Sequence, residues 1–283
     1  MTPTTADIDA VCNLVNELCG IYLDTSKDYL IEGRLARLLK QHGCKDYVEL
    51  SRKARITPAL KADVVDAITT NETLWFRDST PFEALKFKII PELVDAKAGS
   101  PFPKKFRIWS AACSTGQEAY SIAMTFADTV PDFHKWDLEI YGTDVSPSAV
   151  ERANAASYSD LEVSRGLKQQ HKGAYFVRRG SSWVVNDALR KCCKFEVRNL
   201  LKPLTGVGRF DIIFCRNVAI YFTPPDRKKL FTGLANTLNR GGWMFTGSGE
   251  SLVDLGANWG PKQHCRAVCY QPSGGNGVAT LAR

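Results

Sequence analysis

Apolar residues recur at intervals of three and four over residues 7–68, and this spacing predicts amphipathic helices. The recurring positions are Leu14, Val15 and Leu18, then Leu30, Ile31, Leu35, Leu38 and Leu39, then Val64, Val65 and Ile68. Gly20 and Gly43 interrupt the pattern. Thr57-Pro58 is typical of a helix start, with threonine as the N-cap and proline at the first helical position. We therefore expect an N-terminal all-helical domain over residues 1–80.

From about residue 100 the pattern changes to short apolar runs separated by amphipathic helices. The runs cover residues 106–113, 138–145, 194–201, 210–218 and 243–247. This alternation predicts a mostly parallel sheet with helices on both faces. We expect a linker helix over 81–103, with a joint at 99–103, then the α/β domain over 104–272 and a flexible tail over 273–283.

A hairpin signal lies between the second and third runs. Residues 175–177 and 183–185 are short apolar runs on either side of the turn Arg178-Arg-Gly-Ser-Ser182. Two such runs joined by a glycine-containing turn predict a β-hairpin. We expect a small antiparallel β subdomain, inserted in the α/β domain at about residues 173–193.

Composition excludes several classes of protein. The 283 residues are 44% hydrophobic and 24% charged, which fits a globular chain with a sizeable core. No run reaches the roughly 20 apolar residues of a membrane helix, and the polar start lacks the features of a secretory signal. The nine cysteines form no paired CxxC motifs, which favours reduced thiols over a zinc site. We expect a cytoplasmic protein without a metal or membrane insertion.

The net charge is +7, and part of the surplus lies in the helical region. Residues 28–62 contain eight basic and four acidic side chains, a surplus of four. Such a face can attract a nucleic acid, an acidic membrane or an acidic protein, or it can simply be solvated. Without further observations the solvated face is favoured, and the scarcity of aromatic residues there argues against base stacking.

The loop after the first apolar run is the first place to expect a ligand, because ligands bind beyond the carboxyl ends of the strands in open α/β sheets. Its residues, 111–118, are mostly small, and the helix expected from about Gln117 would present free N–H groups. The loop lacks the Lys-Ser/Thr pair of a Walker motif, and Gly116 is its only glycine. A triphosphate is therefore disfavoured, and a dinucleotide is only weakly supported.

A carboxylate lies near the end of each of the first two runs. Asp144 ends the second run, 28 positions after Gly116, where dinucleotide folds place an acid that accepts hydrogen bonds from ribose hydroxyls. It could equally cap the helix expected near Pro147. Ribose without a phosphate cradle favours S-adenosylmethionine, and Glu118 offers a second carboxylate for its ammonium or ribose.

Four blocks of the chain resemble the signature sequences of the CheR family of chemotaxis receptor glutamate methyltransferases. They are Thr69-Thr-Asn-Glu-Thr-Leu-Trp-Phe-Arg-Asp78, Arg107-Ile-Trp-Ser-Ala-Ala-Cys-Ser-Thr-Gly-Gln-Glu118, Gly142-Thr-Asp-Val-Ser146 and Phe210-Asp-Ile-Ile-Phe-Cys-Arg-Asn-Val-Ala-Ile-Tyr-Phe222. Their order and spacing match, and the resemblance extends from the helical region to about residue 270. It implies a Rossmann-like S-adenosylmethionine-dependent methyltransferase domain with an N-terminal helical domain and a small inserted antiparallel β subdomain.

The resemblance also implies a reaction and a set of residues. The reaction would transfer a methyl group from S-adenosylmethionine to glutamate side chains of receptor methylation helices, giving glutamyl methyl esters and S-adenosylhomocysteine. The implied cofactor contacts are Asn71, Thr73, Arg77, Glu118, Asp144, Asn199, Leu200, Arg216 and Asn217. Ordinary structural explanations exist for several of them: Asn71 as a helix cap, Asn199 as a turn residue and Arg216 as half of an ion pair.

The substrate side requires orientation more than activation, because a carboxylate is already ionised at neutral pH. Arg77 and Tyr221 are the candidates for aligning it, although Tyr221 could be a core aromatic instead. The basic helical face, with Arg34, Arg37 and Lys40, would attract the acidic receptor helices.

The resemblance also bears on the partners that we expect for this chain. Family members that bind the C-terminal pentapeptide of a receptor have a longer loop than residues 178–182, so we expect no such tether in this chain. We also expect a monomer.

Two other functions compete with this interpretation. A nucleic-acid methyltransferase would explain the positive charge, and Thr223-Pro-Pro-Asp226 superficially resembles the loop of amino methyltransferases. That loop stacks an aromatic side chain on the flipped base, however, where this chain has Asp226. A non-catalytic receptor-binding module is the second alternative, but it would not need both Asp144 and Arg77.

Overall fold

The computed structural model describes every residue except 1–2, 25–27, 99–103, 254, 256–258 and 273–283. The expected joint at 99–103 and the expected tail at 273–283 therefore lie outside the described residues. None of the helices in the described part is long and apolar enough to cross a membrane.

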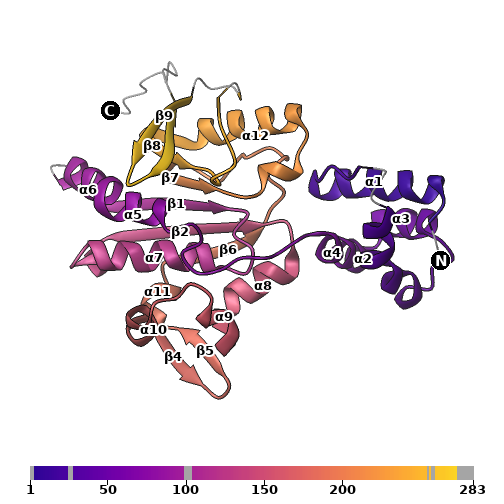
Figure 1. Cartoon of the computed structure of the whole chain (residues 1–283), viewed down its shortest axis with the longest axis horizontal. Helices are drawn as coiled ribbons and strands as arrows, with labels where there is room; N and C mark the ends of the chain where they lie inside the picture. Colours follow the sequence, from indigo (N-terminus) through magenta and orange to yellow (C-terminus); the bar gives the residue numbers. More distant parts are fainter. Residues whose placement is uncertain (1–2, 25–27, 99–103, 254, 256–258, 273–283) are drawn as a thin grey trace.

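The N-terminal region forms a helical body at one end of the molecule (Figure 1). Its helices are α1 (Thr5–Cys19), α2 (Asp28–Gln41), α3 (Tyr47–Ile56) and α4 (Pro58–Ile68). All of the periodic apolar residues predicted from the sequence except Leu30 pack together as its core, and Leu14, Leu35 and Val64 are fully buried. Thr57 occupies the N-cap position of α4 with proline after it, as predicted, but its side chain makes no capping hydrogen bond.

The α/β region is built on a seven-stranded sheet of order β6-β2-β1-β7-β8-β10-β9. The strands are β1 (Lys105–Ala111), β2 (Asp137–Asp144), β6 (Cys193–Val197), β7 (Phe210–Cys215), β8 (Leu238–Phe245), β9 (Trp259–His264) and β10 (Ala267–Pro272). The five predicted strands are all present and mutually parallel. The antiparallel strands β9 and β10 at the edge were not predicted.

Helices cover both faces of this sheet and bury two apolar layers. They are α5 (Thr80–Ala84), the π-helical turn η1 (Leu85–Ile89), α6 (Ile90–Ala98), α7 (Gln117–Thr129), α8 (Pro147–Ala155) and α12 (Pro224–Thr237). The segment expected as a linker helix is interrupted by η1 and is part of the sheet core, because Phe82, Leu85 and Ile89 are buried in it. Its apolar residues are therefore needed for packing, and the segment is more than a connection.

A three-stranded antiparallel sheet of order β3-β5-β4 projects from the α/β region (Figure 1). The predicted hairpin is confirmed as β4 (Phe176–Arg179) and β5 (Ser182–Val185). The subdomain begins earlier than expected, because β3 (Ser157–Tyr158) pairs with β5, and α9 (Asp160–Ser164) and α10 (Gln169–Tyr175) lie between β3 and β4. A two-residue strand is too short to leave a periodic pattern.

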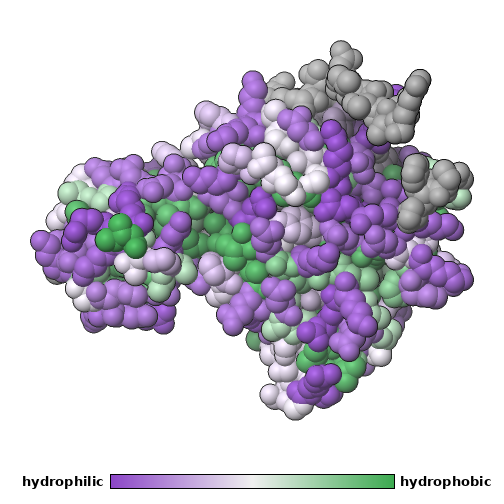
Figure 2. All heavy atoms as spheres, turned by 180° about the vertical axis from the view of Figure 1, so that it is seen from behind, coloured by the Kyte–Doolittle hydropathy of each residue, from purple (hydrophilic) through white to green (hydrophobic). Residues whose placement is uncertain are grey.

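The helical body meets the α/β region at the carboxyl ends of the parallel strands. The side-chain amide of Asn199, after β6, donates to the carbonyl of Leu18 at 2.8 Å. The backbone N–H of Tyr22 donates to the carbonyl of Tyr221, after β7, at 2.9 Å. Figure 2 shows hydrophobic side chains gathering on the surface between the two regions. The loops that the sequence marks as functional therefore face the helical body.

Candidate active site

The loop after β1 turns sharply before α7 begins. Ala112, Ser114 and Gly116 all have left-handed backbone, with φ of 66°, 50° and 96°. A Cβ on Gly116 would lie 3.0 Å from the Cβ of Ala153 and 3.1 Å from the hydroxyl of Tyr158, so only glycine fits this close approach without strain. The tight turn leaves residues 112–114 and Glu118 in the wall of a cavity.

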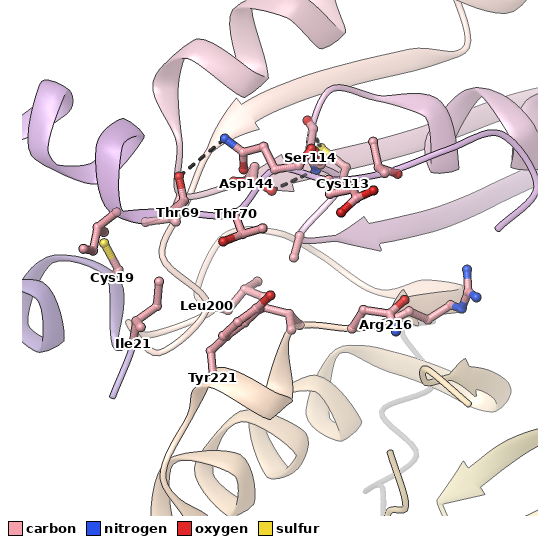
Figure 3. Close-up of a pocket in the computed structure, with 18 of the residues that line it drawn as sticks. Cys19, Ile21, Thr69, Thr70, Cys113, Ser114, Asp144, Leu200, Arg216 and Tyr221 are labelled. Atoms are coloured by element: carbon pink, nitrogen blue, oxygen red, sulfur yellow. Dashed lines mark hydrogen bonds between the residues drawn. The ribbon is translucent and has the colours of Figure 1, made fainter. Parts of the chain in front are cut away.

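This cavity lies between the helical body and the strand ends (Figure 3). Figure 3 shows Asp144 and Ser114 on one side of it, Tyr221 on the opposite side, Arg216 at one end, and Cys19 and Ile21 at the other. Residues of the helical body, the segment before α5 and the loops after β1, β2, β6 and β7 all contribute to its lining. A molecule held here would contact both regions of the chain.

Asp144, at the end of β2, is buried and oriented by the backbone around it. One carboxylate oxygen accepts the N–H of Ser114 at 2.8 Å, and the other accepts the N–H of Ser146 at 3.0 Å. Burial raises the pKa of the Asp144 carboxyl, and these backbone N–H groups oppose the rise. The side chain of Ser146, not that of Asp144, caps α8. Asp144 also lines the cavity, and a carboxylate has more acceptor sites than these two N–H groups occupy, so it can accept from a ligand there.

Arg216, at the end of β7, joins three parts of the cavity wall. Its guanidinium donates to the carboxylate of Glu118 at 3.0 Å, to the carboxylate of Asp78 at 2.9 Å and to the carbonyl of Arg77 at 2.8 Å. Glu118 also accepts the hydroxyl of Ser110 at 2.7 Å. The side chain of Arg216 is only 1% exposed, and its Nε has no hydrogen-bond partner among the described residues. The ion pair considered from the sequence therefore exists, and it lies in the wall of the cavity.

The segment between α4 and α5 closes the cavity on a third side. The side-chain amide of Asn71 donates to the hydroxyl of Ser146 at 3.2 Å, and the backbone carbonyl of Asn71 accepts the hydroxyl of Ser114 at 2.8 Å. Asn71 thus links two loops and caps no helix. Thr73 and Arg77 also line the cavity. The guanidinium of Arg77 donates to the carbonyl of Glu72 at 3.3 Å, and this single weak contact leaves most of its N–H donors available.

The loop after β7 is held by a residue that the sequence did not single out. The carboxylate of Glu250 accepts the backbone N–H groups of Asn217 at 2.6 Å, Gly247 at 2.8 Å and Ala219 at 2.9 Å. This fixes Asn217 in a left-handed conformation, with φ of 58°, and fixes the short helix η3 (Ala219–Tyr221) after it. Tyr221 lines the cavity and is 36% exposed, so it is not a core aromatic.

Comparisons with known proteins assign this architecture. Residues 6–69 match the model described as CheR methyltransferase, all-alpha domain, and residues 71–266 match CheR methyltransferase, SAM binding domain. The chain belongs to the CheR methyltransferase family. Chemotaxis protein methyltransferase 1 of Pseudomonas aeruginosa is 38% identical over 280 residues, covering 96% of this chain and 99% of the relative. Chemotaxis protein methyltransferase Cher2 of Pseudomonas putida is 37% identical over 281 residues, with the same two coverages.

The cavity of this CheR-family chain fits S-adenosylmethionine by the chemistry of its lining. The carboxylates of Asp144 and Glu118 can accept hydrogen bonds from hydroxyl and ammonium groups, and the buried Nε of Arg216 lacks a partner that an anionic group would supply. Leu200 and Phe222 add apolar surface for a flat base. The described residues contain no group of three or more side chains suited to hold a metal ion.

The structure brings most of the predicted residues together and leaves three outside the cavity. Asn199 does not line it: its amide donates to Leu18, and its carbonyl accepts the N–H of Leu201 at 2.8 Å, which is the turn role considered from the sequence. Arg37 and Lys40 are exposed on α2 and also lie outside the lining. Arg34 lines the cavity edge, where its guanidinium donates to the carbonyls of Ile68 and Thr69.

Several residues of the helical body that line the cavity were not predicted: Cys19, Ile21, Tyr22, Leu23 and Leu30. Of these five, only Leu30 belongs to the periodic apolar pattern of the sequence, and that pattern indicates only a helix and a core. Burial raises the pKa of the Cys19 thiol to about 12, so it is an inert apolar group at neutral pH. Nothing in a sequence pattern shows that this end of α1 reaches the strand ends of another region.

Proposed function

We propose that this chain transfers the methyl group of S-adenosylmethionine to glutamate side chains on the signalling helices of chemoreceptors, giving glutamyl methyl esters in sensory adaptation. Membership of the CheR family supports the class of reaction. The observation that carries the proposal is the meeting of Asp144, Glu118, Arg216, Arg77 and Tyr221 around one cavity. Three of these groups suit a cofactor, and the other two suit an incoming carboxylate.

The cofactor, when bound, supplies a methyl group on a positively charged sulfur. We assign Asp144 to its ribose hydroxyls, Glu118 to its ammonium and Arg216 to its carboxylate, because each pairing matches a donor with an acceptor or opposite charges. Leu200 would contact the adenine, and Asn71, Thr73 and Asn217 would close the pocket around the cofactor. For Asn199 we propose an indirect role, as the link that holds the Leu200 loop to α1.

The substrate carboxylate needs position and a dry surrounding rather than a base. It is ionised at neutral pH, and its charge decreases as the new bond forms, so exclusion of water and correct alignment lower the barrier. Arg77 has donors to spare, and Tyr221 has a hydroxyl at the cavity rim. A very strong contact with Arg77 would make the carboxylate a weaker nucleophile. We therefore propose orientation, not activation, as the role of both residues.

Replacement of Arg77 tests this assignment. Arg77→Ala should lower kcat for receptor methylation by about 100-fold, because misplacement of a reacting group by about 1 Å can cost that much. The affinity for S-adenosylhomocysteine should fall much less. Methyl transfer is measured with a tritiated donor and membrane receptors, and affinity by calorimetry. Arg179→Ala, at an exposed arginine of the hairpin, is the control and should retain full activity. Near-normal methylation by Arg77→Ala would contradict the role.

The same assay separates the proposed function from its two alternatives. A glutamyl methyl ester releases its label in mild alkali, whereas a methylated base does not. Alkali-stable label on DNA or RNA would indicate a nucleic-acid methyltransferase. Failure of the protein to bind S-adenosylhomocysteine would indicate a non-catalytic receptor-binding module.

We propose that the exposed basic residues of α2 attract the acidic receptor helices. Arg37→Glu/Lys40→Glu should raise KM for receptors about tenfold at low ionic strength, and the effect should shrink as salt is added. Arg34 is excluded from the test because it holds two backbone carbonyls. Arg240→Glu/Lys262→Glu makes the same charge change at exposed positions of β8 and β9 and is the control. Equal KM values for the two double variants would show that the α2 face is only solvated.

The remaining assignments are proposals of the same kind. We propose a cytoplasmic monomer that binds no nucleic acid and inserts into no membrane. We propose that residues 1–80 are the receptor-facing domain and residues 104–272 the methyltransferase domain. The turn at 178–182 is closed by a hydrogen bond from Arg178 to the carbonyl of Gly180 at 2.9 Å, and this compact turn supports independence from a receptor pentapeptide.

A further inference from the structure

We propose that the inserted subdomain, residues 157–185 (the insert), holds residues 72–78 (the Arg77 segment) in the conformation that the reaction needs. This inference rests on the proposed function of Arg77. It gives the insert a task inside the enzyme itself. Trp75, Phe76 and Glu72 each contact the insert through a different kind of interaction.

Trp75 is the central contact between the two. Its backbone N–H donates to the carbonyl of Arg165 at 3.1 Å, and its indole N–H donates to the carbonyl of Glu162 at 3.1 Å. The ring is fully buried and packs edge-on against Tyr158 and Phe176, with centroid distances of 4.9 Å and 5.2 Å. All four partners belong to the insert. Trp75 lies two positions before Arg77. The insert therefore accepts both of its N–H groups and packs against its ring.

The insert also lies very close to the backbone of Trp75, at Gly166. Gly166 has φ of 93°, and a Cβ at this position would lie 2.1 Å from the carbonyl oxygen of Trp75. No other residue type could occupy position 166 without moving one of the two segments. The local sequence of the insert is thus fitted to the Arg77 segment.

Phe76, the neighbour of Arg77, lies on a histidine of the insert. The rings of Phe76 and His171 are stacked, with centroids 4.8 Å apart and planes inclined by 19°. His171 is itself held, because its Nε2 lies 2.9 Å from the carboxylate of Asp128 on α7. The same carboxylate accepts the hydroxyl of Tyr175 at 2.6 Å. Helix α10 is therefore anchored to the sheet domain, and its imidazole ring supports Phe76.

The Arg77 segment needs this support because its backbone is strained. Phe76 and Asp78, on either side of Arg77, have φ of 50° and 54°, a region that residues other than glycine rarely adopt. Such conformations persist only where the surroundings enforce them. Arg216 holds the far side of the segment through the carbonyl of Arg77 and the carboxylate of Asp78. The insert holds the near side, so loss of its contacts should let the strained residues relax and move Arg77.

The chain offers a matched pair of variants at the surface of the insert. Arg165 and Arg178 are 43% and 41% exposed, and each pairs with one carboxylate, at 2.8 Å and 2.6 Å. The partner of Arg165 is Glu72 in the Arg77 segment, whereas the partner of Arg178 is Asp160 in the insert itself. Arg165→Ala therefore loosens the contact between the two parts, and Arg178→Ala loosens only the insert.

The test measures hydrogen exchange of the amides of residues 72–78 together with kcat, KM and the affinity for S-adenosylhomocysteine. Arg165→Ala should speed exchange of these amides two- to threefold and lower kcat by a similar factor, while Arg178→Ala changes neither. His171→Leu, which removes the stack and the contact with Asp128, should speed exchange at least tenfold and lower kcat at least tenfold. KM for receptors and cofactor affinity should change less than threefold in all three.

Unchanged exchange in Arg165→Ala and His171→Leu would overturn the inference, and so would faster exchange with wild-type kcat. If His171→Leu fails to fold, the two arginine variants decide the question alone. Absence of base-labile methyl transfer by the wild-type protein would refute the proposed function instead. Normal transfer by the wild type with unaltered exchange in the variants would refute only the role of the insert.

Discussion

Arg216→Met is expected to lower the affinity for S-adenosylhomocysteine more than 100-fold and to lower the free energy of unfolding by about 3 kcal/mol. The side chain is 1% exposed and makes three charge-assisted or carbonyl hydrogen bonds. Its removal leaves Glu118, which is only 13% exposed, without its cation. Binding is lost because the cofactor carboxylate would then enter a wall that contains two unpaired carboxylates.

Two further variants separate the loss of binding from the loss of stability. Arg216→Lys keeps the charge but cannot reach Glu118, Asp78 and the carbonyl of Arg77 together, so we expect intermediate values for both quantities. Arg216→Met/Glu118→Gln removes the isolated charge, so stability should recover in part while binding stays lost. Urea denaturation and calorimetry measure the two quantities. Arg216→Met with wild-type cofactor affinity would contradict the role assigned to this residue.

The strands that could be predicted from the sequence are those with a run of buried apolar side chains. Strand β7 is buried along its whole length and is almost entirely apolar, whereas β1 and β2 begin with alternating exposed and buried residues and become continuously buried only toward their carboxyl ends. Strands β9 and β10 lack that signal, because β9 is mostly polar and the turn between them is Cys265-Arg266, with φ of 48° and 63°. A hairpin turn of this kind normally contains glycine or asparagine, and without them the sequence gives no reason to expect one.

The candidate site could be predicted where residues follow directly from strand ends. Asp144 ends β2, Arg216 follows the last residue of β7, and Glu118 lies in the first turn of α7 after the β1 loop. Parallel strands bring their carboxyl ends to one edge of a sheet. Glu250 was missed because its partners are backbone N–H groups of two different loops. The apolar cavity residues at the end of α1, on α2 and between these helices were missed for a similar reason. Their position depends on how two separately packed regions meet, and hydrophobic periodicity does not describe that contact.

Asp144→Asn is the second large effect, and it should reduce cofactor affinity while sparing the fold. We expect the affinity for S-adenosylhomocysteine to fall about 30- to 100-fold, since hydrogen bonds to a charged group contribute about 1.5–3 kcal/mol. Asparagine has one carbonyl oxygen, so it can accept from Ser114 or from Ser146 but not from both. That loss destabilises the loop, whereas removal of a buried charge stabilises it. The net change in unfolding free energy at pH 7 should therefore be small.

The difference in stability between wild type and Asp144→Asn should also change with pH, and the direction of the change follows from the pKa shift of Asp144. Burial raises the pKa of Asp144 in the folded protein above its unfolded value of about 3.9, so the folded state holds the proton more tightly. The stabilising contribution of Asp144 to the folded state is then fully present below the unfolded pKa and is lost as pH rises through the folded pKa. Asparagine does not titrate, so the stability of wild type relative to Asp144→Asn should decrease as pH rises from about 4 through the folded pKa of Asp144.

Urea denaturation at several pH values measures this difference directly. Asp187→Asn, at an exposed carboxylate on α11 (Asp187–Arg190), is the matched control, and the stability of wild type relative to this variant should not show the fall. A pH-independent difference for Asp144→Asn would mean that burial does not penalise its charge. Unchanged cofactor affinity would mean that the ribose is bound elsewhere in the cavity. The two measurements therefore test the electrostatic state of Asp144 and its contact with the ligand independently.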